Sequence, residues 1–353
     1  MSTLRTAISA IALCAAALVL SPALVQAFPD RPITIIVPSS PGGSTDLMAR
    51  IMGQKLTERW GQPVVISNVP GAGGSIGAAR AAKAPPDGYT WLMTTNSPLT
   101  TNLALYKSLD YDERDFASVA MVAQSPMLLV ANPKLGVRTA KQLVEAAKKE
   151  PGKIAVGISG FGAGTHLAIS EFSRLTDTKF TVVPYRGGPP MLAAMISGEE
   201  VLVGFSDIVP ALPLVRDGKL VAVATPLLQR SAAAPEVPTI EEAGVPKIDV
   251  TSWNGIFIPK DTPAEIVKLI NGEVNRIFGD TDVRQRIEAI GQNPVPPMSQ
   301  EQFANFVRAE VPRWRESTVF DENERAVLEY AEAMTATPPT VTDEMVEQLT
   351  VLL

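Results

Sequence analysis

The chain has 353 residues, with 31 Lys or Arg against 37 Asp or Glu and a single cysteine. The basic residues form no long run, which argues against nucleic-acid binding. The one cysteine, Cys14, lies in an apolar N-terminal stretch. We therefore expect no disulfide, thiol catalysis or thiolate metal site in the mature chain.

Residues 1–27 have the pattern of a secretory signal peptide. Arg5 supplies the positive charge, residues 8–20 are apolar, and Val25-Gln26-Ala27 offers the small residues that a signal peptidase reads. A membrane anchor is the alternative, but the apolar run is short for a span and breaks at Ser21-Pro22. We expect cleavage after Ala27 and export.

Downstream of this segment, strand-like runs alternate with helical runs. The expected elements are strand 33–37, helix 45–59, strand 63–67, helix 76–83, strand 89–94, strand 127–131, helix 139–149, strand 154–158, helix 165–175, strand 181–183, helix 189–197, strand 201–205, helix 209–217 and strand 220–224. This alternation is typical of mostly parallel sheets covered by helices, and it predicts an α/β fold.

A glycine-rich turn at residues 38–46 connects the first strand to the first helix. Gly42 and Gly43 allow a ligand to approach the backbone, and the first helical amides lack intrahelical partners. These amides and the helix dipole favour a carboxylate or a phosphate. The alternative is a capped turn, with Ser44 or Thr45 as the N-cap.

A second glycine-rich turn, at residues 159–166, also leads from a strand into a helix. Ligands of open α/β sheets lie outside the carboxyl ends of the strands, so these two turns suit two domains that face each other across a cleft. Gly160-x-Gly162-x-x-Thr165 lacks the third glycine and the acidic residue of a dinucleotide site, and we expect no cofactor. The glycine-rich segment 68–77 lacks the Lys-Ser/Thr of a phosphate loop and is interpreted as a structural turn.

His166 is the only histidine of the chain. A catalytic role would need a nucleophile and an acidic third member, and Ser159 and Thr165 have no obvious acidic partner. No His–His or His–Cys spacing indicates a metal site. We expect a capping or pocket-wall residue, with no catalytic and no metal-binding residue in the chain.

Several short blocks follow one another in order along the chain. They are Phe28-Pro29-Asp30-Arg31-Pro32-Ile33, Pro41-Gly42-Gly43-Ser44-Thr45-Asp46, Gly61-Gln62-Pro63-Val64-Val65, Asn68-Val69-Pro70-Gly71-Ala72-Gly73-Gly74-Ser75-Ile76-Gly77, Pro86-Asp87-Gly88-Tyr89-Thr90, His166-Leu167-Ala168, Val183-Pro184-Tyr185-Arg186-Gly187, Ala234-Pro235-Glu236-Val237-Pro238-Thr239 and Thr251-Ser252-Trp253-Asn254-Gly255. Together, from about residue 28 to Glu316, they resemble the receptors of the tripartite tricarboxylate transporter family, also called Bug proteins.

The resemblance implies a periplasmic solute receptor with a two-lobed, type II-like periplasmic-binding-protein fold. Such a receptor closes on a small mono-, di- or tricarboxylate and delivers it to the membrane subunits of a tripartite tricarboxylate-type transporter. Residues 28–127 and 250–316 would form the first lobe and residues 128–249 the second, with crossings near 127–132 and 249–257. An exported hydrolase or transferase on the same fold is the alternative, which the absence of a plausible triad disfavours.

The resemblance also implies a set of ligand-binding residues. They are Gly42, Gly43, Ser44, Thr45 and Asp46 on the first loop, Ser159, Gly162, Gly164, Thr165 and His166 on the second, Tyr185, Arg186 and Gly187 after the next strand, and Ser206 and Asp207 after Phe205. The family commonly has lysine at the position of Arg186, and arginine could hold a carboxylate at two points. The family often has Asp-Asn where this chain has Ser206-Asp207.

The segment 317–353 does not continue this pattern. It is similar to an internal stretch of the carboxymuconolactone decarboxylase (AhpD-like) family, but it lacks the reactive cysteine and histidine segment of that family. We expect two short amphipathic helices, about 321–335 and 343–352, without that activity, and we interpret the segment as a fused or frameshifted gene end.

Overall fold

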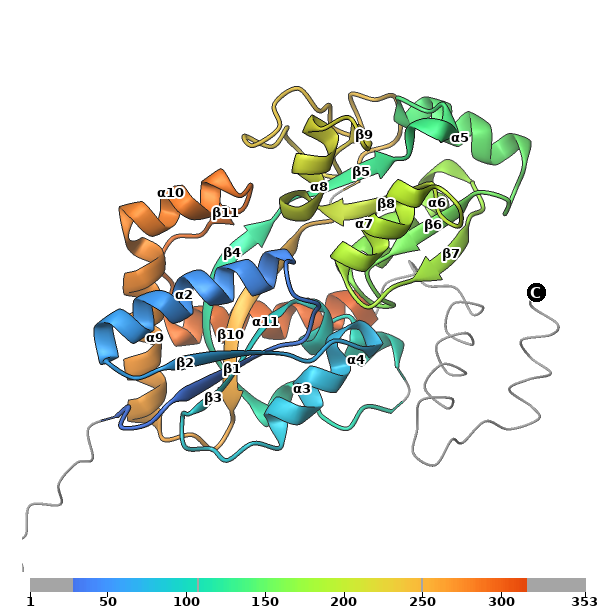
Figure 1. Ribbon diagram of the computed structural model, residues 1–353. Coiled ribbons are helices and arrows are strands. Elements are labelled where there is room, and N and C mark those ends of the chain that lie inside the picture. Colours follow the sequence, from blue (N-terminus) through green and yellow to red (C-terminus); the bar gives the residue numbers. More distant parts are fainter. Residues whose placement is uncertain (1–27, 107, 249, 316–353) are drawn as a thin grey trace, which may run out of the picture.

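The computed structural model describes residues 28–106, 108–248 and 250–315, which form two β-sheets with helices on both faces of each (Figure 1). The expected signal peptide and the C-terminal segment 317–353 lie outside the described residues, so both stay predictions. Within the described part, no helix has the length and apolar character that a membrane span requires.

The first sheet has six strands in the order β11-β4-β10-β3-β1-β2. They are β1 (Ile33–Val37), β2 (Val64–Asn68), β3 (Thr90–Thr95), β4 (Phe116–Ser125), β10 (Ser252–Pro259) and β11 (Asn293–Pro294). One face packs against α2 (Ser44–Trp60), α9 (Ala264–Gly279) and α10 (Thr281–Ala289). The other face packs against α3 (Ser75–Ala82) and α11 (Gln300–Arg315).

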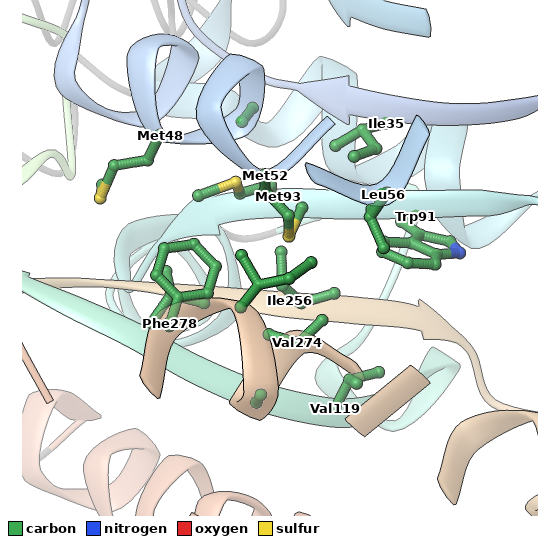
Figure 2. Packing of buried hydrophobic residues seen from close by; sticks show 14 of the residues in the cluster. Ile35, Met48, Met52, Leu56, Trp91, Met93, Val119, Ile256, Val274 and Phe278 are labelled. Atoms are coloured by element: carbon green, nitrogen blue, oxygen red, sulfur yellow. The ribbon is translucent and has the colours of Figure 1, made fainter. Parts of the chain in front are cut away.

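Alternation along the strands assigns each apolar side chain to one of these faces. Ile35 of β1 is fully buried on the side of α2 and α9, where Figure 2 shows it with Met52 and Trp91. Its neighbour Ile36 belongs to the cluster on the opposite face. Because successive strand residues point to opposite faces, an apolar run such as 33–37 supplies both layers of the core.

The second sheet has five strands in the order β7-β6-β8-β5-β9. They are β5 (Met127–Ala131), β6 (Ala155–Ile158), β7 (Thr181–Pro184), β8 (Val203–Asp207) and β9 (Val221–Ala224). Helices α5 (Ala140–Lys149) and α6 (Gly164–Thr176) cover one face. Helices α7 (Gly188–Ser197) and α8 (Ile208–Arg216) cover the other.

The predicted α/β class is confirmed, but the expectation of mostly parallel sheets is wrong. β10 is antiparallel to β3 and β4, and β5 is antiparallel to β8 and β9. The parallel strands of both sheets end on the side where the sheets face each other. The chain reaches β5 and β10 directly from the other sheet. Each of these strands therefore begins on the side where the sheets face each other and runs in the opposite direction.

The strands near 127–132 and 249–257 were expected to cross from one lobe to the other. In the structure the chain crosses in short segments before these strands, β5 and β10. β4 ends at Ser125 and β5 begins at Met127, so the first passage is at Pro126. β5 pairs only within the second sheet and β10 only within the first. The lobe boundaries themselves stay a prediction, which rests on the membership of the strands in these sheets.

Candidate functional site

A cavity of about 430 Å³ lies between the two sheets, at the carboxyl ends of their strands. Its walls come from the loops after β1, β2, β6, β7 and β8, together with the start of β10. Ten of the expected ligand-binding residues line it: Gly43, Ser44, Thr45, Ser159, Gly164, Thr165, Tyr185, Arg186, Gly187 and Asp207. The topology therefore brings together loops that are far apart in the sequence.

Five helices, α2, α3, α6, α7 and α8, begin at this cavity without a side-chain cap. The residues that precede them, all of which line the cavity, are Gly43, Gly74, Ala163, Gly187 and Asp207. The alternative of a turn capped by Ser44 or Thr45 is thus wrong, because Gly43 occupies the N-cap position of α2 and both hydroxyls lie inside the helix. The uncapped amides and the helix dipoles make the cavity wall favourable for negative charge.

Two helices that begin elsewhere provide a contrast, although α9, which follows Pro263, also lacks a side-chain cap. Thr139 caps α5 in a reciprocal arrangement with Gln142, and Asp280 caps α10 through the amide of Val283. A side-chain cap stabilises a helix by about 1 kcal/mol. Its absence leaves the first amides of α2 and α6 open to a ligand. At α3 and α8 the first amide instead donates to a backbone carbonyl, Ser75 N to Ala72 O and Ile208 N to Pro126 O, and the first turn of α7 contains Pro189 and Pro190, which have no N–H.

Two hydroxyl groups of the first loop reach the opposite wall of the cavity. Ser44 Oγ donates to Asp207 Oδ2 at 2.8 Å, and Ser40 Oγ donates to the carbonyl oxygen of Arg186. Both bonds join residues of the first-sheet loops to residues of the second-sheet loops. They therefore exist only while the two sides of the cavity are close together.

Thr45 belongs to a buried chain of hydrogen bonds within the first sheet. Its Oγ1 donates to Asn254 Oδ1 at 2.7 Å, while Asn254 Nδ2 donates to Ser125 Oγ at 2.6 Å and Ser125 Oγ donates to Gln292 Oε1 at 2.6 Å. In the same region Ser252 Oγ donates to Asn96 Oδ1 at 3.1 Å. The protons of Thr45 and Ser252 are thus directed to protein acceptors.

The hydroxyls of the second loop bond to each other. Ser159 and Thr165 lie 2.9 Å apart through their Oγ atoms, and the Ser159 amide donates to Thr165 Oγ1 at 3.0 Å. These contacts stay within one loop and hold it against the start of α6. They do not depend on the opposite wall.

Asp46 and Gly42 do not line the cavity, although the sequence placed them in the site. The Asp46 carboxylate is turned into the first lobe, where it accepts from the Gly42 amide at 2.9 Å and from Asn68 Nδ2 and Arg50 Nε at 3.0 Å each. Burial alone would raise the pKa of Asp46, but the hydrogen bonds from Arg50, Gly42 and Asn68 outweigh it and hold the pKa below its usual value. The pair fixes the shape of the first loop.

Gly162, His166 and Ser206 also lie behind the cavity wall. The Gly162 amide donates to His166 Nδ1 at 3.1 Å, and the imidazole is fully buried beside the ring of Phe161. Ser206 is fully buried, and its Oγ donates to the carbonyl oxygen of Asp207. Because strand residues alternate, Ser206 and Asp207 cannot both face the cavity. Whether any of the predicted residues contacts a ligand stays a prediction.

Arg186 and Tyr185 line the cavity differently from the expectation. The Arg186 residue is exposed, its carbonyl accepts from Ser40, and among the described residues its guanidinium forms no ion pair. Tyr185 Oη donates to Glu200 Oε2 at 3.1 Å. The backbone at 185–187 therefore forms the wall, and no cation of this segment is buried in it.

Asp207 is the acidic residue that lines the cavity, at the end of β8. Its surface is partly open to the cavity. Burial raises the pKa of the Asp207 carboxyl above its usual value, although the hydrogen bond from Ser44 opposes the rise. In the part of the chain that the structure describes, no cluster of three His, Cys, Asp or Glu side chains is arranged to hold a metal ion.

Sequence reasoning missed one wall of the cavity, the loop between β2 and α3. Residues Pro70, Gly71, Ala72, Gly73 and Gly74 line it, with Ser39, Ser40, Phe161 and Ser252 as further missed members. A phosphate-loop motif was the wrong test for this segment. The available signal was the same as for the other two loops, a glycine-rich turn from a strand into a helix.

The loop at Gly73 meets the second lobe closely. A Cβ atom at Gly73 would lie 2.1 Å from the carbonyl oxygen of Phe161, and one at Gly160 would lie 3.2 Å from Gly73 Cα. A Cβ atom at Gly162 would lie 2.1 Å from Asn102 Oδ1. Glycine at these positions permits the two lobes to close on each other.

Comparison with known proteins gives a consistent result. A family model described as tripartite tricarboxylate transporter family receptor matches residues 48–319. Protein BugT of Bordetella pertussis is 35% identical over 296 residues, which cover 83% of this chain and 90% of that protein. A Pseudomonas protein encoded in the tcbD-tcbE intergenic region is 34% identical over 297 residues, covering 84% of this chain and 88% of its own length.

Two solved structures of relatives contain small carboxylates. The R. palustris protein Rpa4515, solved with adipate, superposes with a TM-score of 0.79 at 33% identity and covers 82% of this chain and 96% of its own. MatC from Rhodopseudomonas palustris, solved with malate, has a TM-score of 0.77 at 32% identity, covering 82% and 99% respectively. These matches confirm the predicted two-lobed α/β fold and the resemblance that the sequence blocks indicated. The chain belongs to the tripartite tricarboxylate transporter receptor family.

Proposed function

We propose that this receptor captures a small carboxylate in the cavity between its two lobes, in the periplasm, and delivers it to the membrane subunits of a tripartite tricarboxylate-type transporter. The observation that carries the proposal is that the uncapped N-termini of α2 and α6, one from each sheet, border the same cavity. Such amides bind a carboxylate without a buried cation. The adipate and malate complexes of the two relatives support the same ligand class.

The ligand leaves this receptor unchanged in our proposal. A hydrolase or transferase would need an activated hydroxyl at the cavity. The pair Ser159 and Thr165 is the available hydroxyl pair on the second loop, and His166 lies behind the wall with its Nδ1 accepting from the Gly162 amide. An Nδ1 atom that accepts this bond cannot also take a proton from a nucleophile.

The closing test uses calorimetry on the processed protein with propionate, succinate, adipate, malate and citrate. We expect at least one of them to bind, and mass spectrometry to recover it unchanged after incubation. Recovery of a converted product would favour the enzyme alternative. Failure of every acid to bind would contradict the proposal as a whole.

Gly43→Val tests the location of the site. Gly43 has φ −77 and ψ 168, which valine adopts readily, and a Cβ atom there meets only the Ser40 carbonyl oxygen, at 3.5 Å. The fold should therefore persist, while affinity falls by about tenfold or more, equal to about 1.4 kcal/mol. The matched control is Gly272→Val on α9, which is exposed and has no atom within 4 Å of a Cβ. Unchanged affinity in Gly43→Val would place the site elsewhere.

A further inference from the structure

We propose that the ligand carries a protonated amine beside its carboxylate, and that Asp207 is the residue that binds this amine. The inference rests on the proposed function, because it assumes that the carboxylate is held in the same cavity. It concerns the chemical class of the ligand and the residue that selects it.

The first argument is the charge at the cavity wall. Asp207 accepts one hydrogen bond, from Ser44 Oγ at 2.8 Å, and its surface is partly open to the cavity. Among the described residues no Lys or Arg forms an ion pair with it, and Arg186, the cation of the neighbouring loop, is exposed. Burial already disfavours the charged form of Asp207, and a ligand with carboxylates alone would add to that cost, whereas a positive group on the ligand would offset it.

The second argument is the direction of the hydroxyl protons. A hydroxyl has a single proton to donate, and those of Ser44, Thr45 and Ser252 are directed to Asp207, Asn254 Oδ1 and Asn96 Oδ1. On these three hydroxyl groups only oxygen lone pairs remain available. A ligand atom that contacts them must therefore be a hydrogen-bond donor.

The two arguments together define a ligand with two kinds of group. The uncapped helix starts at Gly43 and Ala163 offer amide donors, which suit a carboxylate. Asp207 and the hydroxyl lone pairs offer acceptors, which suit a donor. An ammonium group satisfies these acceptors and also neutralises Asp207, whereas a hydroxyl group supplies a donor without charge. The expected ligand class is an amino acid.

The test compares acids that differ in one substituent. Calorimetry on the processed wild-type protein uses succinate, malate and aspartate as one series and propionate, lactate and alanine as a second. We expect the amino member of at least one series to bind about tenfold tighter than its unsubstituted member. Equal or tighter binding of the unsubstituted acid in both series would overturn the inference. A hydroxy acid that binds tighter than its amino counterpart would also overturn it, because a neutral donor would then be sufficient.

Asp207→Asn assigns the effect to a residue. Asparagine keeps a carbonyl oxygen for the Ser44 hydroxyl and removes only the charge. We expect this variant to lose the preference for the amino acid while the unsubstituted acid binds at least as well as in wild type. An unchanged preference would contradict the role of Asp207. A variant that fails to fold leaves the wild-type series as the deciding measurement. Failure of these six acids and of adipate and citrate to bind would contradict the proposed function instead.

Discussion

The two glycine-rich loops that face each other across the cavity have similar sequences but different hydrogen-bond partners. The first loop, 38–46, sends the hydroxyls of Ser40 and Ser44 to the opposite lobe. The second loop, 159–166, bonds its hydroxyls at Ser159 and Thr165 to each other. The same local pattern thus produces one loop that is coupled to closure and one that is rigid by itself.

The glycines of the two loops differ in whether they contact the opposite lobe: that of the second loop does, and that of the first does not. In the first loop, Gly42 has φ +81, and a Cβ atom there would meet nothing within 4 Å. In the second loop, Gly162 has φ +73, and a Cβ atom would lie 2.1 Å from Asn102 Oδ1 of the other lobe. The second loop therefore contributes to closure through the space that its glycine leaves, and the first through its hydroxyl donors.

The largest effect is expected from Gly162→Ala. The new methyl group would collide with Asn102, whose Nδ2 is itself held by Gly73 O and Ser75 Oγ, so the lobes could not close fully. We expect affinity for the bound carboxylate to fall by about 100-fold, which corresponds to about 2.8 kcal/mol. Calorimetry measures the loss, and small-angle X-ray scattering with saturating ligand should show a more open molecule.

Gly42→Ala is the matched variant of the first loop. It imposes the same positive φ on alanine but no contact across the cavity, so its cost is the backbone strain of about 1–2 kcal/mol alone. We expect it to lower stability and to leave closure intact. If both variants weakened binding equally, strain and not contact would explain the result.

Removing the anchor of the first loop should have the next largest effect. Asp46→Asn removes the charge and one acceptor oxygen, either Oδ2, which accepts from both Gly42 and Arg50, or Oδ1, which accepts from Asn68. We expect the free energy of unfolding to fall by about 2 kcal/mol. Urea denaturation at pH 7 measures this loss. Glu150→Gln, which breaks an ion pair with Lys153 between two exposed side chains, is the control and should cause no measurable change.

The effect of Asp46→Asn should also depend on pH. The pKa of Asp46 lies below its usual value in the folded protein. Its contribution is therefore present above the unfolded pKa of about 3.9 and is lost as the pH falls through the folded pKa. We expect the difference between wild type and variant to shrink when denaturation is repeated at acid pH. A difference that stays constant down to pH 3 would indicate a loss of packing instead of a loss of charge.

Local pattern predicted most elements of the fold, and its failures have a common cause. Strand 33–37 and the start of α2 follow from an apolar run and a glycine turn, both of which are local. The antiparallel direction of β10 depends on the return of the chain from the other lobe, more than 120 residues after β4 begins, which no window of sequence contains. The order of neighbours in a sheet is likewise a property of the whole chain.

The glycine-rich turns after β1 and β6 predicted two walls of the cavity. The wall after β2 was missed because segment 68–77 was tested only for a phosphate-loop motif, although it too is a glycine-rich turn from a strand into a helix. Asp46 was misplaced because its partner Asn68 lies on another strand, and the pairing of the two is invisible in sequence. Ser206 was misplaced because the strand was expected to end at residue 205, with Ser206 and Asp207 in the following loop, whereas β8 extends to Asp207 and includes both residues. Because successive residues of a strand point to opposite faces, Ser206 and Asp207 then point in opposite directions, and only Asp207 lines the cavity.

Hydroxyl deletions compare the two loops directly. Ser44→Ala removes the bond to Asp207 across the cavity, and a hydrogen bond to a charged group contributes about 1.5 kcal/mol or more, so we expect about tenfold weaker binding. Ser159→Ala removes a bond within one loop and should change affinity only about two- to threefold. Calorimetry on both variants decides between the two roles. A larger loss in Ser159→Ala would reverse the comparison.

The smallest effect is expected from Arg186→Met. The sequence alone suggested that this guanidinium could hold a ligand carboxylate at two points, in which case methionine would be severely deleterious. In the structure the residue is exposed, and its carbonyl, which the substitution keeps, is the group that accepts from Ser40. An exposed charge near a bound anion contributes little and is screened by salt, so we expect at most about a fivefold loss of affinity. Calorimetry at low and high ionic strength measures it, and the loss should disappear at high salt. A large loss that persists at high salt would show that the guanidinium turns into the cavity when the ligand binds.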